Sequence, residues 1–191
     1  GRSKLHIEEM LRDLAVSKPE FTAAILRYFN PVGAHKSGRI GEDPMGIPNN
    51  LMPMIAQVAV GRRELVKVLG NDYDTSDGTG VRDYIHVTDL ARAHVAALDW
   101  TQNHNCSRAF NLGVGQGVSV KEMIAAYAKA SGRHVPYKIA PRRDGDIASC
   151  YADPSRANAE LNWHAEIGLD EMCASSWNWQ ESNPRGYEPE G

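Results

Sequence analysis

The stretch Thr22-Ala23-Ala24-Ile25-Leu26-Arg27-Tyr28 decides the fold of this chain. It is short and mostly apolar, which is typical of a strand that is buried on both faces of a parallel sheet. Before it, apolar residues recur at helical spacing over residues 3–16, and Lys18-Pro19 ends that helix. A helix, a short loop and a buried strand in this order predict an α/β fold.

Further helices and strands alternate along the rest of the chain. Periodicity and punctuation predict helices at 51–60, 88–100, 119–131, 155–161 and 170–181, and strands at 66–69, 83–86, 109–112 and 136–140. Asn50 is a candidate cap for the first of these helices. Residues 29–50 form a long loop, and a structureless loop of about 20 residues in a compact domain is often functional. Residues 182–191 are expected to be frayed.

The composition is that of an ordinary folded protein. Its 191 residues carry 21 Lys+Arg against 24 Asp+Glu, a net charge of −3, so no overall charge draws the chain to nucleic acid or to an anionic membrane. No apolar run approaches the roughly 20 residues that span a bilayer. The cysteines Cys106, Cys150 and Cys173 are odd in number and widely spaced, which argues against a disulfide framework or zinc ribbon and suits a reducing cytoplasm.

Two loops contain motifs that could bind a ligand. Residues 113–117 read G-x-G-x-G between a strand and a helix, but the dinucleotide fingerprint is G-x-G-x-x-G followed by an acidic residue, so a structural turn is the better interpretation. Asp72, Asp74 and Asp77 lie in the acidic loop 70–80, which lacks the central Gly and final Glu of a calcium loop. We therefore expect a solvated loop there and no metal site.

Polar residues near two other turns suit a phosphorylated, hydroxyl-rich ligand. Arg142 and Arg143 are adjacent and followed by two aspartates, so a phosphate grip and a surface ion-pair cluster are equally good interpretations. Arg82 could be a second clamp. Asn30, Asn49 and Asn50 follow a predicted parallel strand, and ligands of open α/β sheets bind at the carboxyl ends of such strands. His86, in contrast, is expected to be a structural histidine.

Several motifs, in the same order along the chain, resemble one enzyme family. They are the opening G-R-S-K, similar to the end of a Y-x-x-x-K motif, and the segments 26–35, 47–51, 70–80, 78–87, 110–113 and 143–146. This set resembles the UDP-glucose 4-epimerase family of the extended short-chain dehydrogenase/reductases. The sequence also begins without Met, so we expect it to be a carboxyl-terminal fragment of a longer chain.

The resemblance implies a domain organisation. The fold would be the carboxyl-terminal part of a Rossmann-type doubly wound parallel sheet plus a smaller mixed α/β substrate-binding domain. Residues 1–30 would end the NAD-binding domain, and residues 31–191 would bind the UDP-sugar, with the segment near 83–113 returning to the first domain. A homodimer is expected for the full-length protein.

The resemblance also implies a reaction. UDP-glucose and UDP-galactose would be interconverted in galactose metabolism by transient, NAD-dependent oxidation at C4 of the hexose. A Tyr immediately before Gly1, absent here, would be the catalytic base. Lys4 would supply the ammonium that favours its phenolate, because free Tyr has a pKa near ~10. These 191 residues alone are therefore expected neither to retain NAD nor to epimerise.

Other site residues follow from the same resemblance. Lys4 and Tyr28 would contact NAD. The UDP-hexose would be bordered by Tyr28, Phe29, Asn30, Asn49, Asn50, Leu51, Lys67, Val68, Leu69, Arg82, Arg143, Asp146 and Cys150. Arg82 and Arg143 would neutralise the pyrophosphate, and Asp146 would accept hydrogen bonds from the ribose.

Cys150 bears on substrate choice. Family members restricted to glucose and galactose tend to carry Tyr at this position, and a smaller residue leaves room for an N-acetyl group, so UDP-GlcNAc and UDP-GalNAc are further candidate substrates. Two alternatives stay open. One is another NAD-dependent nucleotide-sugar enzyme, a dehydratase or decarboxylase. The other is a non-catalytic nucleotide-sugar-binding module.

Overall fold

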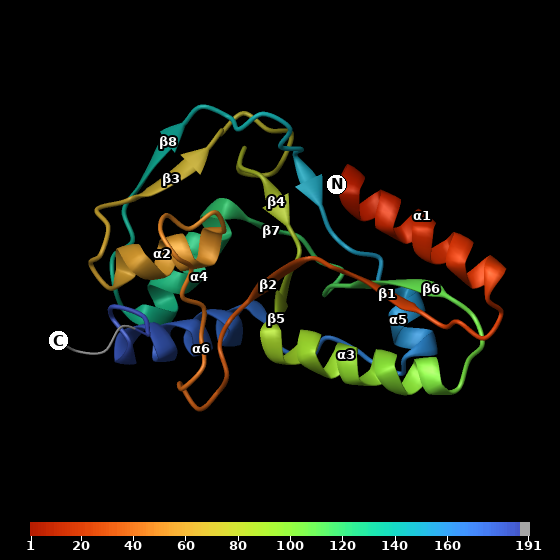
Figure 1. Cartoon of the computed structure of the whole chain (residues 1–191). Coiled ribbons are helices and arrows are strands. Elements are labelled where there is room, and N and C mark those ends of the chain that lie inside the picture. The colour runs from red at the N-terminus through yellow and green to blue at the C-terminus, as the bar shows by residue number, and fades with distance from the viewer. Residues whose placement is uncertain (188–191) are drawn as a thin grey trace.

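The computed structural model describes residues 1–187 of the chain (Figure 1). The helices are α1 Arg2–Ser17, α2 Leu51–Ala59, α3 Val87–Gln102, α4 Val120–Ser131, α5 Ser155–Glu160 and α6 Leu169–Ser182. The strands are β1 Ala24–Tyr28, β2 Asn30–Val32, β3 Val66–Leu69, β4 Val81–Arg82, β5 Tyr84–His86, β6 Arg108–Leu112, β7 Val118–Ser119, β8 Tyr137–Ala140 and β9 Ser149–Cys150. No helix in this part of the chain is both long and apolar enough to cross a membrane.

The strand pairs confirm the α/β prediction. β1 pairs with β6, β2 with β5, and β3 with β8, each in parallel. β4 lies between β9, its parallel partner, and β7, its antiparallel partner. The predicted helices and longer strands are all present, whereas β2, β4, β7 and β9 were not predicted. Strands of two or three residues are too short to show the alternation by which a strand is recognised in a sequence.

The expectation that β1 is buried on both faces was wrong. Arg27 and Tyr28 are exposed, and the first three residues of the strand are only partly covered. Among the described residues β1 has one partner strand, β6, so its other edge is open. α1 is held near it mainly by Glu8, the one buried residue of that helix, which accepts hydrogen bonds from Arg27 and Arg12.

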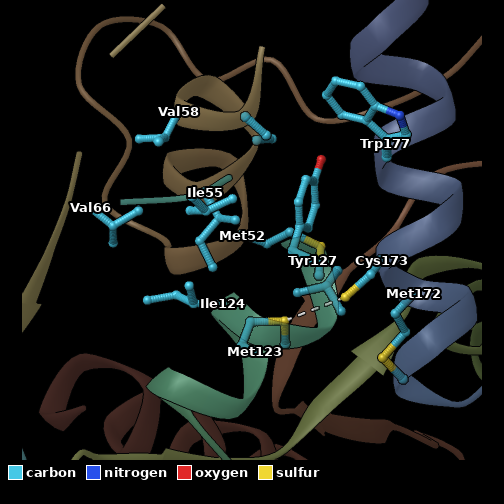
Figure 2. Packing of buried hydrophobic residues seen from close by; sticks show 14 of the residues in the cluster. Met52, Ile55, Val58, Val66, Met123, Ile124, Tyr127, Met172, Cys173 and Trp177 are labelled. Carbon is cyan, nitrogen blue, oxygen red and sulfur yellow. Dashed lines mark hydrogen bonds between the residues drawn. The ribbon is translucent and has the colours of Figure 1, made fainter. Parts of the chain in front are cut away.

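Two apolar cores support the fold. The first joins α2, α4, α6 and β3, and Figure 2 shows Met52, Ile55, Met123 and Tyr127 converging from α2 and α4 toward α6. The Cys173 thiol donates to the Met123 sulfur at 3.9 Å within it. The second core joins α3, α5, β5 and β6. The short strand β5 lies between the two cores, because Tyr84 belongs to the first and Ile85 to the second, so both cores fix its position. β4 directly precedes it in the chain (Figure 1).

His86 is structural, as predicted. Its Nδ1 accepts the Thr88 N–H at 3.0 Å and so caps the start of α3, while its Nε2 lies 3.0 Å from the Ser175 hydroxyl of α6. α4 begins with a capping box, in which Ser119 and Glu122 bond reciprocally to each other's backbone N–H. Asn50, in contrast, occupies the cap position of α2 without a side-chain cap hydrogen bond.

The prediction of a frayed tail was wrong for residues 183–187. α6 continues to Ser182, and Tyr187 then hydrogen-bonds to Gly41 and Asp43. Its ring also lies 5.4 Å from that of Trp179. A glycine- and proline-bearing tail looks weakly held in sequence, because these anchoring contacts reach residues far away in the chain. Residues 188–191 of the predicted tail lie outside the described residues.

Asp83 connects three separate segments of the chain. It is fully buried between β4 and β5. Its carboxylate accepts the backbone N–H of Val114 and Gly115 at 2.9 Å each, and that of Ala152 at 3.1 Å. A Cβ on Gly113 would lie 2.5 Å from one of its oxygens, so this glycine is needed for close approach. The 113–117 segment is therefore the structural turn that its sequence predicts.

Replacing Asp83 should destabilise the fold. Asp83→Ala leaves three backbone N–H groups, one buried and two partly buried, without their acceptor. Each such loss costs on the order of 1–3 kcal/mol, so we expect the free energy of unfolding to fall by about 3 kcal/mol or more. Urea denaturation followed by circular dichroism measures it. Asp74→Ala, at an exposed position of the acidic loop, is the control and should change stability by less than about 0.5 kcal/mol. A loss below about 1 kcal/mol for Asp83→Ala would contradict this role.

Candidate nucleotide-binding site

One cavity of about 510 Å³ lies where β2, α2, β3, β4 and β5 meet. Residues from six separate stretches of sequence surround it, so tertiary packing creates it. Its lining residues are Asn30, Ile47, Pro48, Asn49, Asn50, Leu51, Met54, Arg63, Leu65, Val66, Lys67, Leu69, Tyr73, Gly80, Arg82, Tyr84, Val120, Arg143 and Asp146. A cavity of several hundred Å³ with mixed polar and apolar walls is the usual form of a small-molecule site.

Most of the predicted substrate-binding residues line this cavity. They are Asn30, Asn49, Asn50, Leu51, Lys67, Leu69, Arg82, Arg143 and Asp146. The other predicted substrate-binding residues lie elsewhere: Tyr28 ends β1, Phe29 follows it, and Val68 is a buried residue of β3. Lys4, predicted to act in catalysis and to contact NAD, is exposed on α1. Cys150 is half-buried on β9, opposite Arg82 in the β4–β9 pair.

Two arginines and one aspartate form the charged wall of the cavity. The Arg143 guanidinium donates to the Asp146 carboxylate at 2.8 Å, and an Arg82 nitrogen lies 3.8 Å from the same oxygen. The hydrogen bond to Asp146 raises the pKa of Arg143. Two cations that share a single carboxylate leave a net positive charge at this wall. An anionic group such as a phosphate would compensate it.

The adjacent arginines, Arg142 and Arg143, make different contacts. Arg143 lines the cavity, whereas the Arg142 Nε donates to the Asp72 carboxylate at 2.6 Å and its guanidinium lies 4.1 Å from the centre of the Tyr73 ring. The guanidinium of Arg142 lowers the pKa of Asp72. Both interpretations of the arginine pair are thus partly realised. One arginine faces the cavity, and the other makes an ion pair that fixes the acidic loop.

Hydrogen bonds to Asp77 stabilise the conformation of the acidic loop 70–80. Asp77 accepts the Thr79 N–H at 2.8 Å and its hydroxyl proton at 2.6 Å, and the Ser119 hydroxyl donates to its other oxygen. The hydrogen bonds from Ser119 and Thr79 lower the pKa of Asp77 in spite of its burial. In residues 1–187 no three His, Cys, Asp or Glu residues gather as metal ligands.

Within residues 1–187 β3 pairs with β8 alone, so its other backbone edge, toward the cavity, is free. The N–H groups of Val66 and Gly70 donate to carbonyls of the β8 segment at 2.9 and 2.8 Å. Because alternate residues of a strand direct their N–H and C=O groups to opposite sides, those of Lys67 and Leu69 face away from β8. Both residues line the cavity. Their main-chain groups are therefore suited to hydrogen-bond the edge of a planar base.

Sequence reasoning missed Tyr84, Tyr73, Arg63 and Met54, which also line the cavity. Tyr84 and Tyr73 are 5% and 7% exposed, and aromatic residues in short, partly apolar runs look like ordinary core residues. The Arg63 Nε donates to Gln57 at 2.6 Å. It lies in a charged turn that is indistinguishable from a solvated one by sequence.

Comparison with known proteins identifies the family. The chain belongs to the family whose model is described as GDP-mannose 4,6 dehydratase, and this model matches residues 1–176. Curated relatives that are 55–61% identical to the chain are named UDP-glucose 4-epimerase. UDP-glucose 4-epimerase of Bacillus subtilis is 61% identical over 187 residues, which are 98% of this chain and 55% of that relative. The chain thus spans about half the length of the curated relatives it matches.

Solved structures show the same relationship. UDP-glucose 4-epimerase of Bifidobacterium longum, in complex with NAD+ and UDP, matches with a TM-score of 0.94 and 58% identity over 97% of this chain and 55% of that one. The UDP-Glc/GlcNAc 4-epimerase of Campylobacter jejuni matches with a TM-score of 0.76 and 40% identity over 95% of this chain and 55% of that one. The fold is therefore that of roughly half of a Rossmann-like epimerase.

Tyr84 should make stability depend on pH in the alkaline range. Burial raises its pKa to about 12, whereas a tyrosine in the unfolded chain ionises near ~10. The contribution of Tyr84 to the free energy of unfolding is therefore fully present below pH ~10. It is lost as the pH rises toward 12, because the unfolded chain releases the phenol proton first. Urea denaturation at pH 8 and 11 measures the loss, which should be smaller by roughly 1 kcal/mol in Tyr84→Phe.

Tyr137→Phe is the control, because Tyr137 is 45% exposed and lies outside the cavity lining. It should follow the wild-type dependence. Burial also raises the pKa of Tyr127, so part of the alkaline loss should remain in Tyr84→Phe. Identical losses in Tyr84→Phe and the wild type would mean that Tyr84 titrates normally.

Proposed function

We propose that this chain is the UDP-sugar-binding part of a UDP-glucose 4-epimerase, which interconverts UDP-glucose and UDP-galactose in galactose metabolism. One observation carries the proposal. Nine residues that the family resemblance assigns to the substrate line a single cavity, although they come from segments as far apart as Asn30 and Asp146. The structure of the Bifidobacterium relative with NAD+ and UDP supports the same ligand class.

The chemistry of the cavity walls supports a bound UDP. The positive wall of Arg82 and Arg143 would neutralise the pyrophosphate, and Asp146 would accept hydrogen bonds from ribose hydroxyls. The free edge of β3 at Lys67 and Leu69 would bind uracil through the main chain. Uncharged amides, among them Asn30, would border the hexose, with Phe29 and Tyr28 nearby in sequence.

The hexose would be held more loosely than the nucleotide. Epimerisation at C4 returns hydrogen to the opposite face of the sugar, so the hexose must turn in the site while the UDP stays fixed. Ion pairs and main-chain hydrogen bonds on the UDP side, and neutral amides on the sugar side, suit that requirement. The chain's own residues would thus bind and orient the substrate.

NAD is the proposed cofactor, and it would accept and return the hydride. Lys4 and Tyr28 are the residues of this chain that would contact it. Both fit the chemistry. Tyr28 is 49% exposed at the carboxyl end of a parallel strand, where ligands of such sheets bind. Lys4 is exposed on α1 with an ammonium that could steady the phenolate of a neighbouring tyrosine base and hydrogen-bond the nicotinamide ribose.

Other parts of the proposal follow from the same resemblance. Residues 1–30 would end the NAD-binding domain, and residues 31–191 would form the UDP-sugar-binding domain. The pairing of β6 with β1 supports the predicted return of segment 83–113 to the NAD-binding domain. A homodimer is proposed for the full-length protein. The three cysteines are free, which supports the cytoplasmic setting.

An epimerase is favoured over the alternatives. The family model is described by a dehydratase, but the relatives near 60% identity carry the epimerase name. A binding module without catalysis would not explain Lys4 at the end of a Y-x-x-x-K-like motif.

Activity should depend on residues beyond this chain. We expect the 191-residue chain to bind UDP without epimerising UDP-galactose or retaining NAD. Joining it to the amino-terminal part of the Bacillus subtilis epimerase, which the family resemblance implies is the missing part, should restore turnover. A coupled assay for UDP-glucose measures activity, and absorbance of the denatured protein's supernatant measures NAD.

The matched control is the joined protein with Lys4→Met, which should lose at least about 10²-fold in kcat because the base loses its supporting ammonium. Epimerisation by the 191-residue chain alone would refute the expected division of labour. A folded joined protein without epimerase activity would refute the proposed function.

We also propose that N-acetylated UDP-hexoses are substrates. Cys150 lies opposite Arg82 in parallel strands, so both side chains are on the same face of the sheet, and Arg82 lines the cavity. A cysteine there is smaller than the tyrosine of the restricted enzymes. The Campylobacter relative is named a UDP-Glc/GlcNAc 4-epimerase.

Cys150→Tyr in the joined protein tests this proposal. We expect the wild-type joined protein to convert both UDP-galactose and UDP-GlcNAc, and the variant to retain UDP-galactose turnover while losing about 10-fold or more of its kcat/KM for UDP-GlcNAc. Cys106→Tyr, away from the cavity lining, is the control. Turnover of UDP-galactose with none of UDP-GlcNAc by the wild-type protein would exclude the wider specificity.

A further inference from the structure

The loop that supplies Asn49 and Asn50 to the cavity is attached to the carboxyl-terminal turn at residues 183–187. The Gly41 N–H donates to the Tyr187 hydroxyl at 3.0 Å, and that hydroxyl donates to the Gly41 carbonyl at 3.2 Å. The Tyr187 N–H donates to the Asp43 carboxylate at 2.9 Å. Three hydrogen bonds therefore join the two segments, and all of them involve a single residue of the turn.

Two glycines allow this close contact. A Cβ on Gly41 would overlap the indole ring of Trp179, so the loop backbone lies directly against that ring. A Cβ on Gly186 would overlap the Asp43 carboxylate, and Gly186 has a φ of +82°, which side-chain-bearing residues rarely adopt. Each segment therefore has a glycine at the point where the other segment approaches it most closely. A tail that lay near the loop by chance would not require either glycine.

The other end of the same loop forms a wall of the cavity. Ile47, Pro48, Asn49 and Asn50 all line it. The Asn50 amide donates to the Glu42 carboxylate at 3.5 Å rather than capping α2. Glu42 lies between Gly41 and Asp43, the two residues held by Tyr187. A short chain of contacts therefore links the carboxyl-terminal turn to the cavity wall.

We propose that Tyr187 is a positioning residue for nucleotide-sugar binding, acting through loop 41–50 to hold Asn49 and Asn50 against the ligand. The inference rests on the proposed function, in which this wall faces the phosphate and sugar. The opposite wall consists of the β3 edge, which β8 supports. Among the described residues the Tyr187 hydrogen bonds do not reach either strand. Loosening the loop should weaken UDP binding and spare uridine.

Tyr187→Phe separates these effects, because it removes the two hydroxyl hydrogen bonds and keeps the ring beside Trp179. Calorimetric titration of the 191-residue chain with UDP and with uridine should show UDP binding about three- to tenfold weaker and uridine binding within twofold of the wild type. Tyr137→Phe, an exposed tyrosine on β8 outside the cavity lining, is the matched control and should change neither. Backbone hydrogen exchange over residues 41–50 should be faster in ligand-free Tyr187→Phe than in either comparison protein.

Two results would overturn the inference. Equal losses for UDP and uridine would indicate a general loss of structure, and no loss for UDP would show that the contact does not affect binding. Wild-type binding of UDP would in both cases still support the proposed function. A wild-type chain that binds no UDP would count against the proposed function, and hydrogen exchange would still test the loop: unchanged exchange in Tyr187→Phe would overturn the positioning role by itself.

Discussion

The buried carboxylate of Asp83 is the interaction on which the rest of the structure depends. A fully buried charge is tolerated only where hydrogen bonds replace its hydration, and three backbone N–H groups from two other segments do so here. Asp83 separates β4 from β5, so it fixes the backbone from which Arg82 and Tyr84 extend on either side. Both of these neighbours line the cavity. The carboxylate that stabilises the fold therefore also sets the geometry of the charged wall.

A second buried aspartate, Asp89 on α3, is stabilised in a similar way beside the second core. Asp89 accepts the backbone N–H groups of Glu166 and Ile167 at 2.9 Å each, and Arg92 donates to its other oxygen at 2.6 Å. It thereby ties α3 to the segment that precedes α6. The two aspartates lie only six positions apart in the sequence, so one short stretch around β5 organises both halves of the described structure.

Local sequence features predicted the elements well, and long-range contacts account for what was missed. The capping box at Ser119 and the apolar periodicity of α3, α4 and α6 are encoded within a few residues. The exposure of Arg27 depends on which strand lies beside β1, and the order of the tail depends on Gly41. Neither partner can be inferred from nearby sequence.

The candidate site shows the same division. The residues alone left the arginine pair undecided, and only the family resemblance selected Arg143 over Arg142. Their difference arises because one guanidinium can reach Asp72 and Tyr73, which lie about 70 positions earlier in the chain. Tyr84 was missed for the opposite reason. Its neighbours are buried, and nothing local distinguishes an aromatic residue that faces a cavity from one that packs in a core.

The free edge of β3 has a consequence for solubility. An unpaired strand edge is a template on which another chain can add a strand, and proteins usually cover such edges or place charges on them. Here the edge belongs to a strand of alternating buried and exposed residues, and Lys67 is the one charge in it. A planar ligand hydrogen-bonded along this edge would occupy the groups that a second chain needs. Nucleotide binding would then protect the protein from aggregation, independently of any reaction.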